Sequence, residues 1–264
     1  MSGSETMGQG RILVAEDNGV NQKVVLGLLR SLGYHEVEVV EDGQQAVEAV
    51  RHGGIALVFM DCQMPLMDGF EATRAIRADE AATGRARVPV LAMTANTATD
   101  DRDRCQASGM DDFVAKPVLL AELKEKLEQW LGAAETAAAT ENGAAAPVGA
   151  ESAESVLDAA VAAQARSIMG NDFTLLVSAY QDDGARMVEQ LHSALEAGDH
   201  EAVRRTAHRL KGASGNIGAH RVGTRCQLLE QEAAAGRLAH AALEGLAADF
   251  KLACEALERF VHGG

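Results

Sequence analysis

The sequence predicts two domains of different fold class, an α/β domain with a doubly wound parallel sheet followed by an all-α bundle. The chain has 264 residues, about twice the length of a typical domain. Residues 11–131 alternate short apolar runs with segments of helical spacing, whereas only helical spacing is found from residue 155 onward. An Ala-rich stretch with Asn142-Gly143 and Pro147 separates them and predicts a flexible linker. The predicted parts are a disordered tail at 1–9, the first domain at 10–132, the linker at 133–154 and the second domain at 155–264.

The first domain alternates strand-like and helix-like segments five times. The apolar runs that predict strands are 11–15, 37–40, 55–60, 88–93 and 112–115. The segments that predict helices are 19–32, 43–52, 69–79, 98–108 and 119–131. Such repeats predict a five-stranded parallel sheet covered by helices on both faces. Ligands of these sheets bind outside the carboxyl ends of the strands.

The second domain contains helical periods only and no proline after Pro147. The predicted helices are 156–168, 172–197, 200–216, 219–235 and 240–261. Gly198 and Gly236 are natural helix ends. We therefore predict a helical bundle.

Composition excludes several classes of function. A formal net charge of −15 opposes binding to nucleic acid or to anionic lipid. No segment approaches the roughly 20 apolar residues that span a bilayer, and residues 1–9 do not resemble a signal peptide. The four cysteines lack metal-ligand spacing and suggest reduced thiols. We expect a cytoplasmic chain with no nucleic-acid partner and no membrane segment of its own.

Acidic residues follow two of the predicted strands. Glu16 and Asp17 end the first strand, and Asp61 ends the third. Carboxylates packed together repel, and Mg²⁺, which prefers oxygen ligands, relieves that repulsion. Thr94 ends the fourth strand and Lys116 follows the fifth. A carboxylate, a metal, a hydroxyl and an ammonium group together suit an incoming phosphoryl group.

With Met64-Pro-Leu-Met-Asp-Gly69 after Asp61, residues 10–132 resemble the receiver domain of two-component response regulators, which has a flavodoxin-like fold. The resemblance implies that Asp61 is the phosphorylated residue and that Asp17 binds Mg²⁺ directly. It implies that Glu16 acts largely through water and that the backbone carbonyl of Gln63 completes the ligands.

The same resemblance assigns the rest of the site. Thr94 and Lys116 would contact the phosphoryl oxygens, and the Lys116–Pro117 bond would be cis, which proline permits. Phe113 would be the aromatic side chain that reorients on activation, although an ordinary core or edge aromatic explains it equally well.

A helical wheel separates His208 from the predicted core of its helix. With Val203 at zero and about 100° per residue, the positions within about 40° form the buried stripe. These are Ala207, Leu210, Ser214 and Ile217. His208 lies near 140°, away from that stripe. Its neighbours on the wheel are Arg204, Lys211, Gly212 and Gly215. Neutral imidazole is a nucleophile, and the nearby cations, including Arg205, can hold phosphoryl oxygens or meet an acidic partner.

His208-x-x-Lys211-Gly212, with Gly215 and Asn216-Ile-Gly-Ala219, resembles the histidine phosphotransfer (HPt) domain over about residues 155–262. The resemblance implies that His208 carries the phosphoryl group and that Lys211 assists it. The roles of Arg204 and Arg205 follow from the wheel alone.

Together the two resemblances predict a phosphorelay protein. Asp61 would accept a phosphoryl group from an upstream histidine kinase, and His208 would relay it to or from the aspartate of a response-regulator receiver. Such pairs are common at the C-terminal end of hybrid sensor histidine kinases, so the chain is either such a fragment or a freestanding relay protein. It contains no kinase catalytic core, which leaves any enzymatic activity of its own open.

Two other hypotheses remain at this stage. The helical domain could be a docking surface that takes no part in transfer, with the receiver acting as a switch. Alternatively, the chain could be a phosphatase-type sink that drains phosphoryl groups from a partner regulator.

Overall fold

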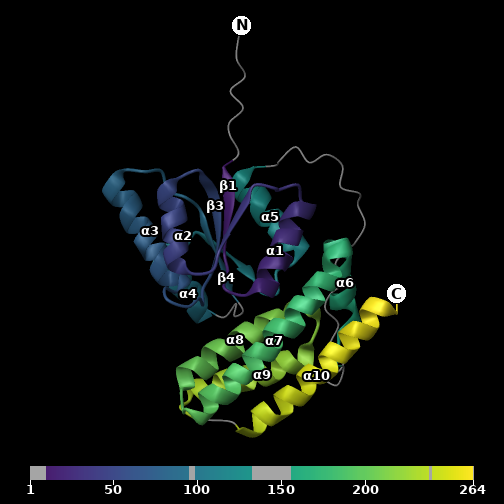
Figure 1. Cartoon of the computed structure of the whole chain (residues 1–264). Helices are drawn as coiled ribbons and strands as arrows, with labels where there is room; N and C mark the ends of the chain where they lie inside the picture. Colours follow the sequence, from purple (N-terminus) through teal and green to yellow (C-terminus); the bar gives the residue numbers. More distant parts are fainter. Residues whose placement is uncertain (1–9, 95–98, 133–155, 238–239, 264) are drawn as a thin grey trace. The chain divides into compact units, whose positions relative to one another are not determined.

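The computed structural model describes residues 10–94, 99–132, 156–237 and 240–263 and divides into two compact units (Figure 1). The predicted tail at 1–9 and the predicted linker at 133–154 lie outside the described residues. The first part of the chain forms a sheet with helices, and the later part is helical, which confirms the predicted fold class.

Five parallel strands form one sheet in the order β2-β1-β3-β4-β5. The strands are β1 (Arg11–Ala15), β2 (Val37–Val40), β3 (Ile55–Asp61), β4 (Val90–Thr94) and β5 (Asp112–Ala115). The helices that alternate with them are α1 (Gly19–Ser31), α2 (Gly43–His52), α3 (Gly69–Thr83), α4 (Thr99–Ser108) and α5 (Leu120–Leu131).

Side chains of the central strands alternate between the two faces of the sheet, as the pleat requires. Val58 and Met60 of β3 join one core cluster with buried side chains of α2 and α3. Leu57 and Phe59 are equally buried on the opposite face, which α5 covers (Figure 1). Burial on both faces explains why these strands are continuously apolar in the sequence.

The strand register determines which residues meet at the carboxyl edge. Ala15 pairs with Met60, so the residues that follow β1 lie beside the end of β3. Asp61 pairs with Met93, and Thr94 pairs with Ala115. The ends of four neighbouring strands therefore bring acidic, hydroxyl and ammonium side chains to one edge.

In the first domain, two predicted boundaries differ from the structure by two residues or more. Strand β4 begins at Val90 and not at Val88, because Pro89 has no N–H group to donate to a neighbouring strand. Helix α3 continues to Thr83, four residues past the predicted end, through helix-forming alanines. It stops at Gly84, whose φ of 70° is the left-handed conformation that glycine adopts easily.

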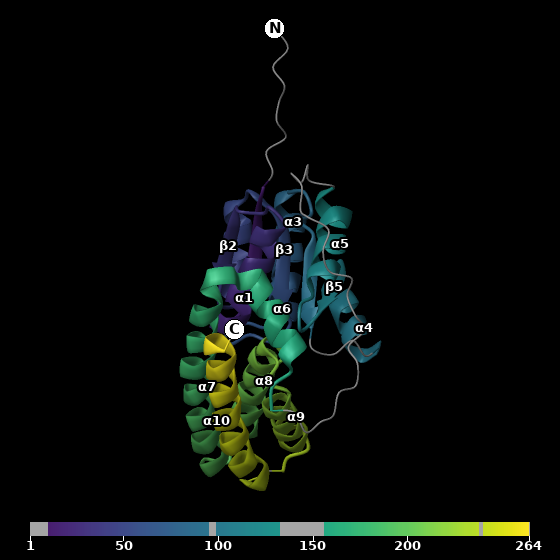
Figure 2. The same ribbon diagram turned by 90° about the vertical axis from the view of Figure 1, so that its right-hand side faces the viewer.

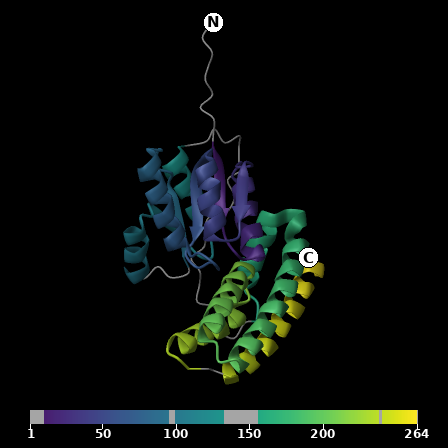
Figure 3. The same cartoon turned by 60° about the vertical axis from the view of Figure 1, so that its left-hand side comes forward.

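The later part of the chain is built from five α-helices and one short 3₁₀ turn in its described residues. These are α6 (Ala159–Met169), η1 (Gly170–Asp172), α7 (Phe173–Glu196), α8 (His200–Ile217), α9 (His220–Ala234) and α10 (His240–His262). Helices α7 to α10 pack in a ring of neighbours, as in a four-helix bundle (Figures 2 and 3). The predicted ends are confirmed, since α7 and α9 stop just before Gly198 and Gly236, both with φ of 70°.

A buried aromatic pair organises the bundle core. Tyr180 is fully buried, and its ring centroid lies 5.5 Å from that of Phe250. Its hydroxyl lies 3.0 Å from Ser214 Oγ on α8, so the buried polar group has a partner. Gly184 makes room for Phe250, because a Cβ there would lie 2.3 Å from the ring. Among the helices that the structure describes, none is long and apolar enough to cross a bilayer.

Candidate functional site

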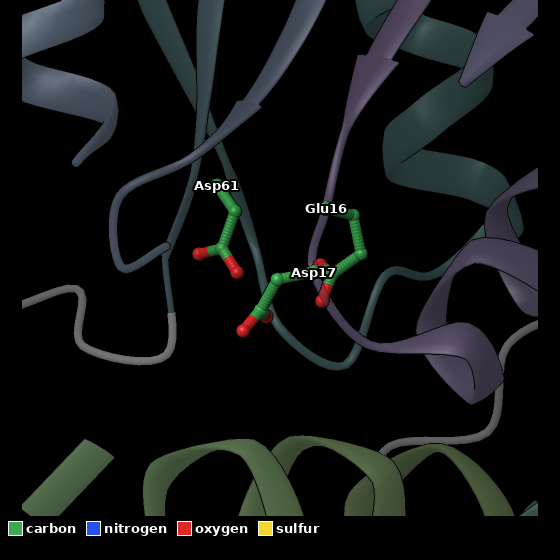
Figure 4. Close-up of side chains that lie close together, drawn as sticks. All are labelled: Glu16, Asp17 and Asp61. Carbon is green, nitrogen blue, oxygen red and sulfur yellow. The ribbon is translucent and has the colours of Figure 1, made fainter. Parts of the chain in front are cut away.

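Three carboxylates converge at the carboxyl edge of the sheet. Oxygen atoms of Glu16, Asp17 and Asp61 all lie within 4.8 Å of one another (Figure 4). Glu16 is 1% exposed and Asp61 is 2% exposed, while Asp17 keeps more of its surface open. The structure thus brings together the three acids that the sequence placed at strand ends.

Lys116 bridges two of these carboxylates. Its Nζ lies 2.6 Å from Glu16 Oε2 and 2.7 Å from Asp61 Oδ2. Burial alone would lower the pKa of Lys116, but the charges and hydrogen bonds of Asp61 and Glu16 outweigh burial and raise it. The Lys116–Pro117 bond is cis, as expected, and the Lys116 N–H donates to the Thr94 carbonyl at 2.8 Å.

His208 lies on α8, at the edge of the side that faces α9. The buried side chains of α8 include all five positions of the predicted stripe, so that part of the wheel is confirmed. The ring of His208 is not freely exposed, however, since only 13% of its side-chain surface is accessible and its Nδ1 lies 2.6 Å from Glu230 Oε1 of α9. The wheel describes one helix and could not show the carboxylate that a neighbouring helix supplies.

Glu230 also binds Lys211, one turn along α8 from His208. Its side chain is 14% exposed. Burial would raise the pKa of Glu230, but the hydrogen bonds and charges of His208 and Lys211 outweigh it and lower the pKa. Glu230 is therefore ionised near neutral pH and joins the histidine to the lysine.

Comparison with known families identifies both parts of the chain. Residues 12–128 match the model of the response regulator receiver domain, and residues 175–260 match that of the Hpt domain. The chain is a receiver domain followed by an Hpt domain. This arrangement belongs to two-component phosphorelay proteins, and several similar proteins are hybrid signal transduction histidine kinases.

The similar curated proteins are far longer than this chain. The hybrid signal transduction protein DokA of Dictyostelium discoideum is 45% identical over 120 residues, which is 46% of this chain and 7% of DokA. The sensor protein GacS of Pseudomonas syringae is 41% identical over 124 residues, which is 47% of this chain and 14% of GacS. The chain therefore matches only a small part of each relative.

Two solved structures also match parts of this chain. The receiver domain of sensor histidine kinase PA1611 from Pseudomonas aeruginosa, solved with magnesium in its active-site cleft, has 45% identity and a TM-score of 0.43. That match covers 48% of this chain and all of the receiver domain. A co-crystal of the Saccharomyces cerevisiae phosphotransfer protein Ypd1 with the receiver domain of Ssk1 includes a chain that is 33% identical with a TM-score of 0.45. That match covers 46% of this chain and 88% of the yeast chain.

The loop from β3 to α3 of the receiver domain closes back on Asp61. The Gly69 N–H donates to the Cys62 carbonyl at 3.3 Å, and a Cβ on Gly69 would lie 2.1 Å from the Asp61 carbonyl oxygen. Only glycine permits this approach. Within the loop the Gln63 N–H donates to Asp61 Oδ1 at 3.1 Å, which holds the carboxylate in place.

Phe113 of the receiver domain is partly buried against the core cluster. The guanidinium carbon of Arg102 on α4 lies 4.3 Å from the centre of its ring. Lys126 Nζ on α5 lies 5.7 Å from the same ring. Cations on two helices thus contact the aromatic side chain, and its role as a switch stays a prediction.

The cations of α8 are less free than the sequence suggested. Arg204 donates to Glu201 at 2.8 and 3.0 Å, and Arg205 lies 3.5 Å from the same carboxylate. The contact with Glu201 raises the pKa of Arg204. Nothing lies within 4 Å of the place where a Cβ of Gly215 would be, so the helix backbone is bare there, as predicted.

Sequence reasoning missed Glu201 and Glu230. Glu201 stands three and four residues before the two arginines, the spacing at which helix side chains meet. His208 and Glu230 lie at equal sequence distance from Ala219, in the turn between α8 and α9. Two antiparallel helices place such positions opposite each other, so this symmetry could have revealed Glu230.

Proposed function

We propose that Asp61 and His208 are the phosphoryl acceptors of the two domains and that the chain relays a phosphoryl group between them. The donor would be an upstream histidine kinase and the recipient a downstream response-regulator receiver. The receiver and Hpt domains support phosphorelay signalling as a class. The observation that carries the finer proposal is that each acceptor contacts a largely buried, charged partner, Lys116 for Asp61 and Glu230 for His208.

The acidic edge of the receiver domain fits a magnesium ion. Three carboxylates converge there, and Lys116 offsets only one of their charges. Asp17 and Asp61 would hold the ion with the Gln63 carbonyl, and Glu16 would act largely through water. When bound, the ion would neutralise charge on the phosphoryl oxygens.

Transfer to Asp61 exchanges one bond for another. A carboxylate oxygen of Asp61 forms the new P–O bond as the P–N bond of a phosphohistidine breaks, and the imidazole nitrogen keeps the electron pair. Lys116 and Thr94 would bind the phosphoryl oxygens that carry the developing charge. Phe113 would change orientation once Thr94 is engaged.

Glu230 determines which nitrogen of His208 reacts. A carboxylate can only accept hydrogen bonds, so Nδ1, which faces it, carries the proton. The lone pair of the neutral ring then lies on Nε2, which is the nucleophile. Lys211 would assist by binding phosphoryl oxygens, and bare backbone at Gly215 would let a partner approach.

Chemical labelling of full-length variants tests the proposal. Acetyl phosphate with Mg²⁺ should label the wild-type chain as both acyl phosphate, which alkali cleaves, and phosphohistidine, which survives alkali. His208→Gln should retain acyl phosphate only, and Asp61→Asn should carry neither. A wild-type chain with acyl phosphate but no phosphohistidine would contradict the relay and favour a helical domain that only docks.

A further inference from the structure

The tip of the loop from β3 to α3 displays an apolar side chain at the edge of the Asp61 site. Leu66 is 86% exposed, and its neighbour Pro65 is exposed as well. Single exposed leucines are common and need no special explanation. Leu66 differs because its φ is 64°, the left-handed conformation, and it is the one non-glycine residue with positive φ in the described chain. That conformation is unfavourable for a leucine and favours glycine or asparagine.

The residues around Leu66 hold it in this conformation. The Met67 N–H donates to the Pro65 carbonyl at 2.7 Å, and the Met67 carbonyl accepts from the Gly43 N–H at 3.1 Å. A Cβ on Gly43 would lie 2.5 Å from that carbonyl, so the approach needs a glycine. Met64 is buried, and α3 begins directly after the loop with Asp68 as its N-cap. The loop is therefore fixed on both sides of Leu66, and only the tip faces outward.

The loop after β5 also carries exposed apolar residues at the same edge of the sheet. Pro117 is exposed, and Leu119, at the start of α5, is 43% exposed. Asp61 ends β3 directly before the first loop, and Lys116 follows β5 at the start of the second. Exposed apolar residues thus lie in both of the loops that begin at these two charged residues.

We propose that Leu66 is a docking residue that selects the protein partner of Asp61, namely the histidine-bearing helix of an Hpt domain on another molecule. The inference rests on the proposed function of Asp61. Because Asp61 is 2% exposed, a histidine can reach it only if the helix that carries it comes down onto the two loops. Helix α8 shows a matching surface, with bare backbone at Gly215 and a surplus of cations, Arg204, Arg205 and Lys211 against Glu201 and Glu230. An apolar tip fits the bare backbone, and the surplus cation complements the acidic site.

A two-step assay with full-length chains separates docking from chemistry. A His208→Gln chain is first labelled on Asp61 with acetyl phosphate and freed of excess donor. It is then mixed with an Asp61→Asn chain, whose His208 accepts the phosphoryl group. Neither chain can transfer within itself, so the phosphohistidine formed measures transfer between molecules.

Position 66 is varied on the first chain. Leu66→Gly and Leu66→Asn should leave the first step unchanged and slow the second about tenfold at low concentration, because burial of one leucine is lost. Leu66→Met, which keeps the apolar surface, should behave as the parent. Leu66→Gly should also raise the melting temperature of the receiver domain by about 2 to 4 °C, because glycine relieves the unfavourable φ.

Each contrary result identifies a different error. Transfer at the parent rate in Leu66→Gly and Leu66→Asn would overturn the docking role. So would an equal loss in both steps, since Leu66 would then act on the chemistry of Asp61. If the parent chain takes no label, or the Asp61→Asn chain gains no phosphohistidine from it, the proposed relay fails and not the docking residue alone.

Discussion

The receiver and Hpt domains each centre on one side chain that bridges two others, and the bridge has opposite charge in the two domains. In the receiver domain the cation Lys116 joins the carboxylates of Asp61 and Glu16. In the Hpt domain the carboxylate of Glu230 joins the cation Lys211 to the ring of His208. In the proposed relay, the cation beside the Asp61 carboxylate balances its charge, whereas the anion beside the His208 imidazole fixes its proton.

The same difference explains why only the receiver domain requires a metal ion in the proposed relay. Three carboxylates and Lys116 leave two negative charges at the edge of the sheet. Glu230 and Lys211 offset each other beside a ring that can stay neutral. The receiver site therefore repels an incoming phosphoryl group until a cation is added, and the Hpt site does not.

Removal of the cationic bridge should produce the largest effect. In Lys116→Met the carboxylates of Asp61 and Glu16 lose their partner, and the phosphoryl oxygens lose a charged donor. We expect labelling of Asp61 by acetyl phosphate to slow about 100- to 1,000-fold. Lys124→Met is the control, because Lys124 is exposed and lies 3.9 Å from Glu128 on the same helix. Equal rates in the two variants would mean that the bridge has no part in the chemistry.

Removal of the anionic bridge should have a smaller effect that depends on the substitute. Glu230→Ala leaves His208 free to rotate and should slow transfer to it by about 10- to 100-fold. Glu230→Gln should slow transfer to His208 less, because its amide oxygen can still accept the hydrogen bond from Nδ1. Glu232→Gln, on the same helix and paired with Arg237, serves as the control. The proposed orientation is wrong if Glu230→Ala transfers at the rate of this control.

The two sites differ in how far the sequence alone could predict them. Glu16 and Lys116 directly follow a strand and Thr94 ends one, and neighbouring parallel strands end at the same edge. The order of strands therefore placed Glu16, Thr94 and Lys116 without coordinates. Glu230 lies on a different helix from His208, and no pattern within α8 points to it. Its position depends on how α8 and α9 pair. The periodicity of one helix carries no information about that pairing.

In the fold, too, features set by the local sequence were predicted, whereas features set by tertiary contacts were not. Helix stops at Gly198 and Gly236 are local properties of the chain and were predicted. The start of β4 at Val90 depends on a hydrogen bond that Pro89 cannot donate to a neighbouring strand. The left-handed conformation of Leu66 is imposed by contacts of the residues around it, so a leucine at that position gave no sign of it.

A pH titration tests the anionic bridge with the smallest perturbation. The ordinary pKa of Glu230 is 4.5, and in the folded chain the hydrogen bonds from His208 and Lys211 outweigh burial and lower it. A carboxylate with a lowered pKa stabilises the fold fully above about pH 4.5, and this contribution is lost as the pH falls through the folded value. We therefore expect the stability of the wild-type Hpt domain to fall more steeply below pH 4.5 than that of Glu230→Gln, which has no carboxylate to protonate at this position.

Imidazole resonances of His208, followed by NMR during the same titration, should shift as the contact with Glu230 is lost. In Glu230→Gln the His208 resonances should not show this change, because the variant has no carboxylate at position 230. If the wild-type chain and the variant lose stability in parallel, the carboxylate makes no net contribution to the fold. Its contact with His208 would then have to be explained by orientation of the ring alone, which the Glu230→Ala transfer rate measures separately.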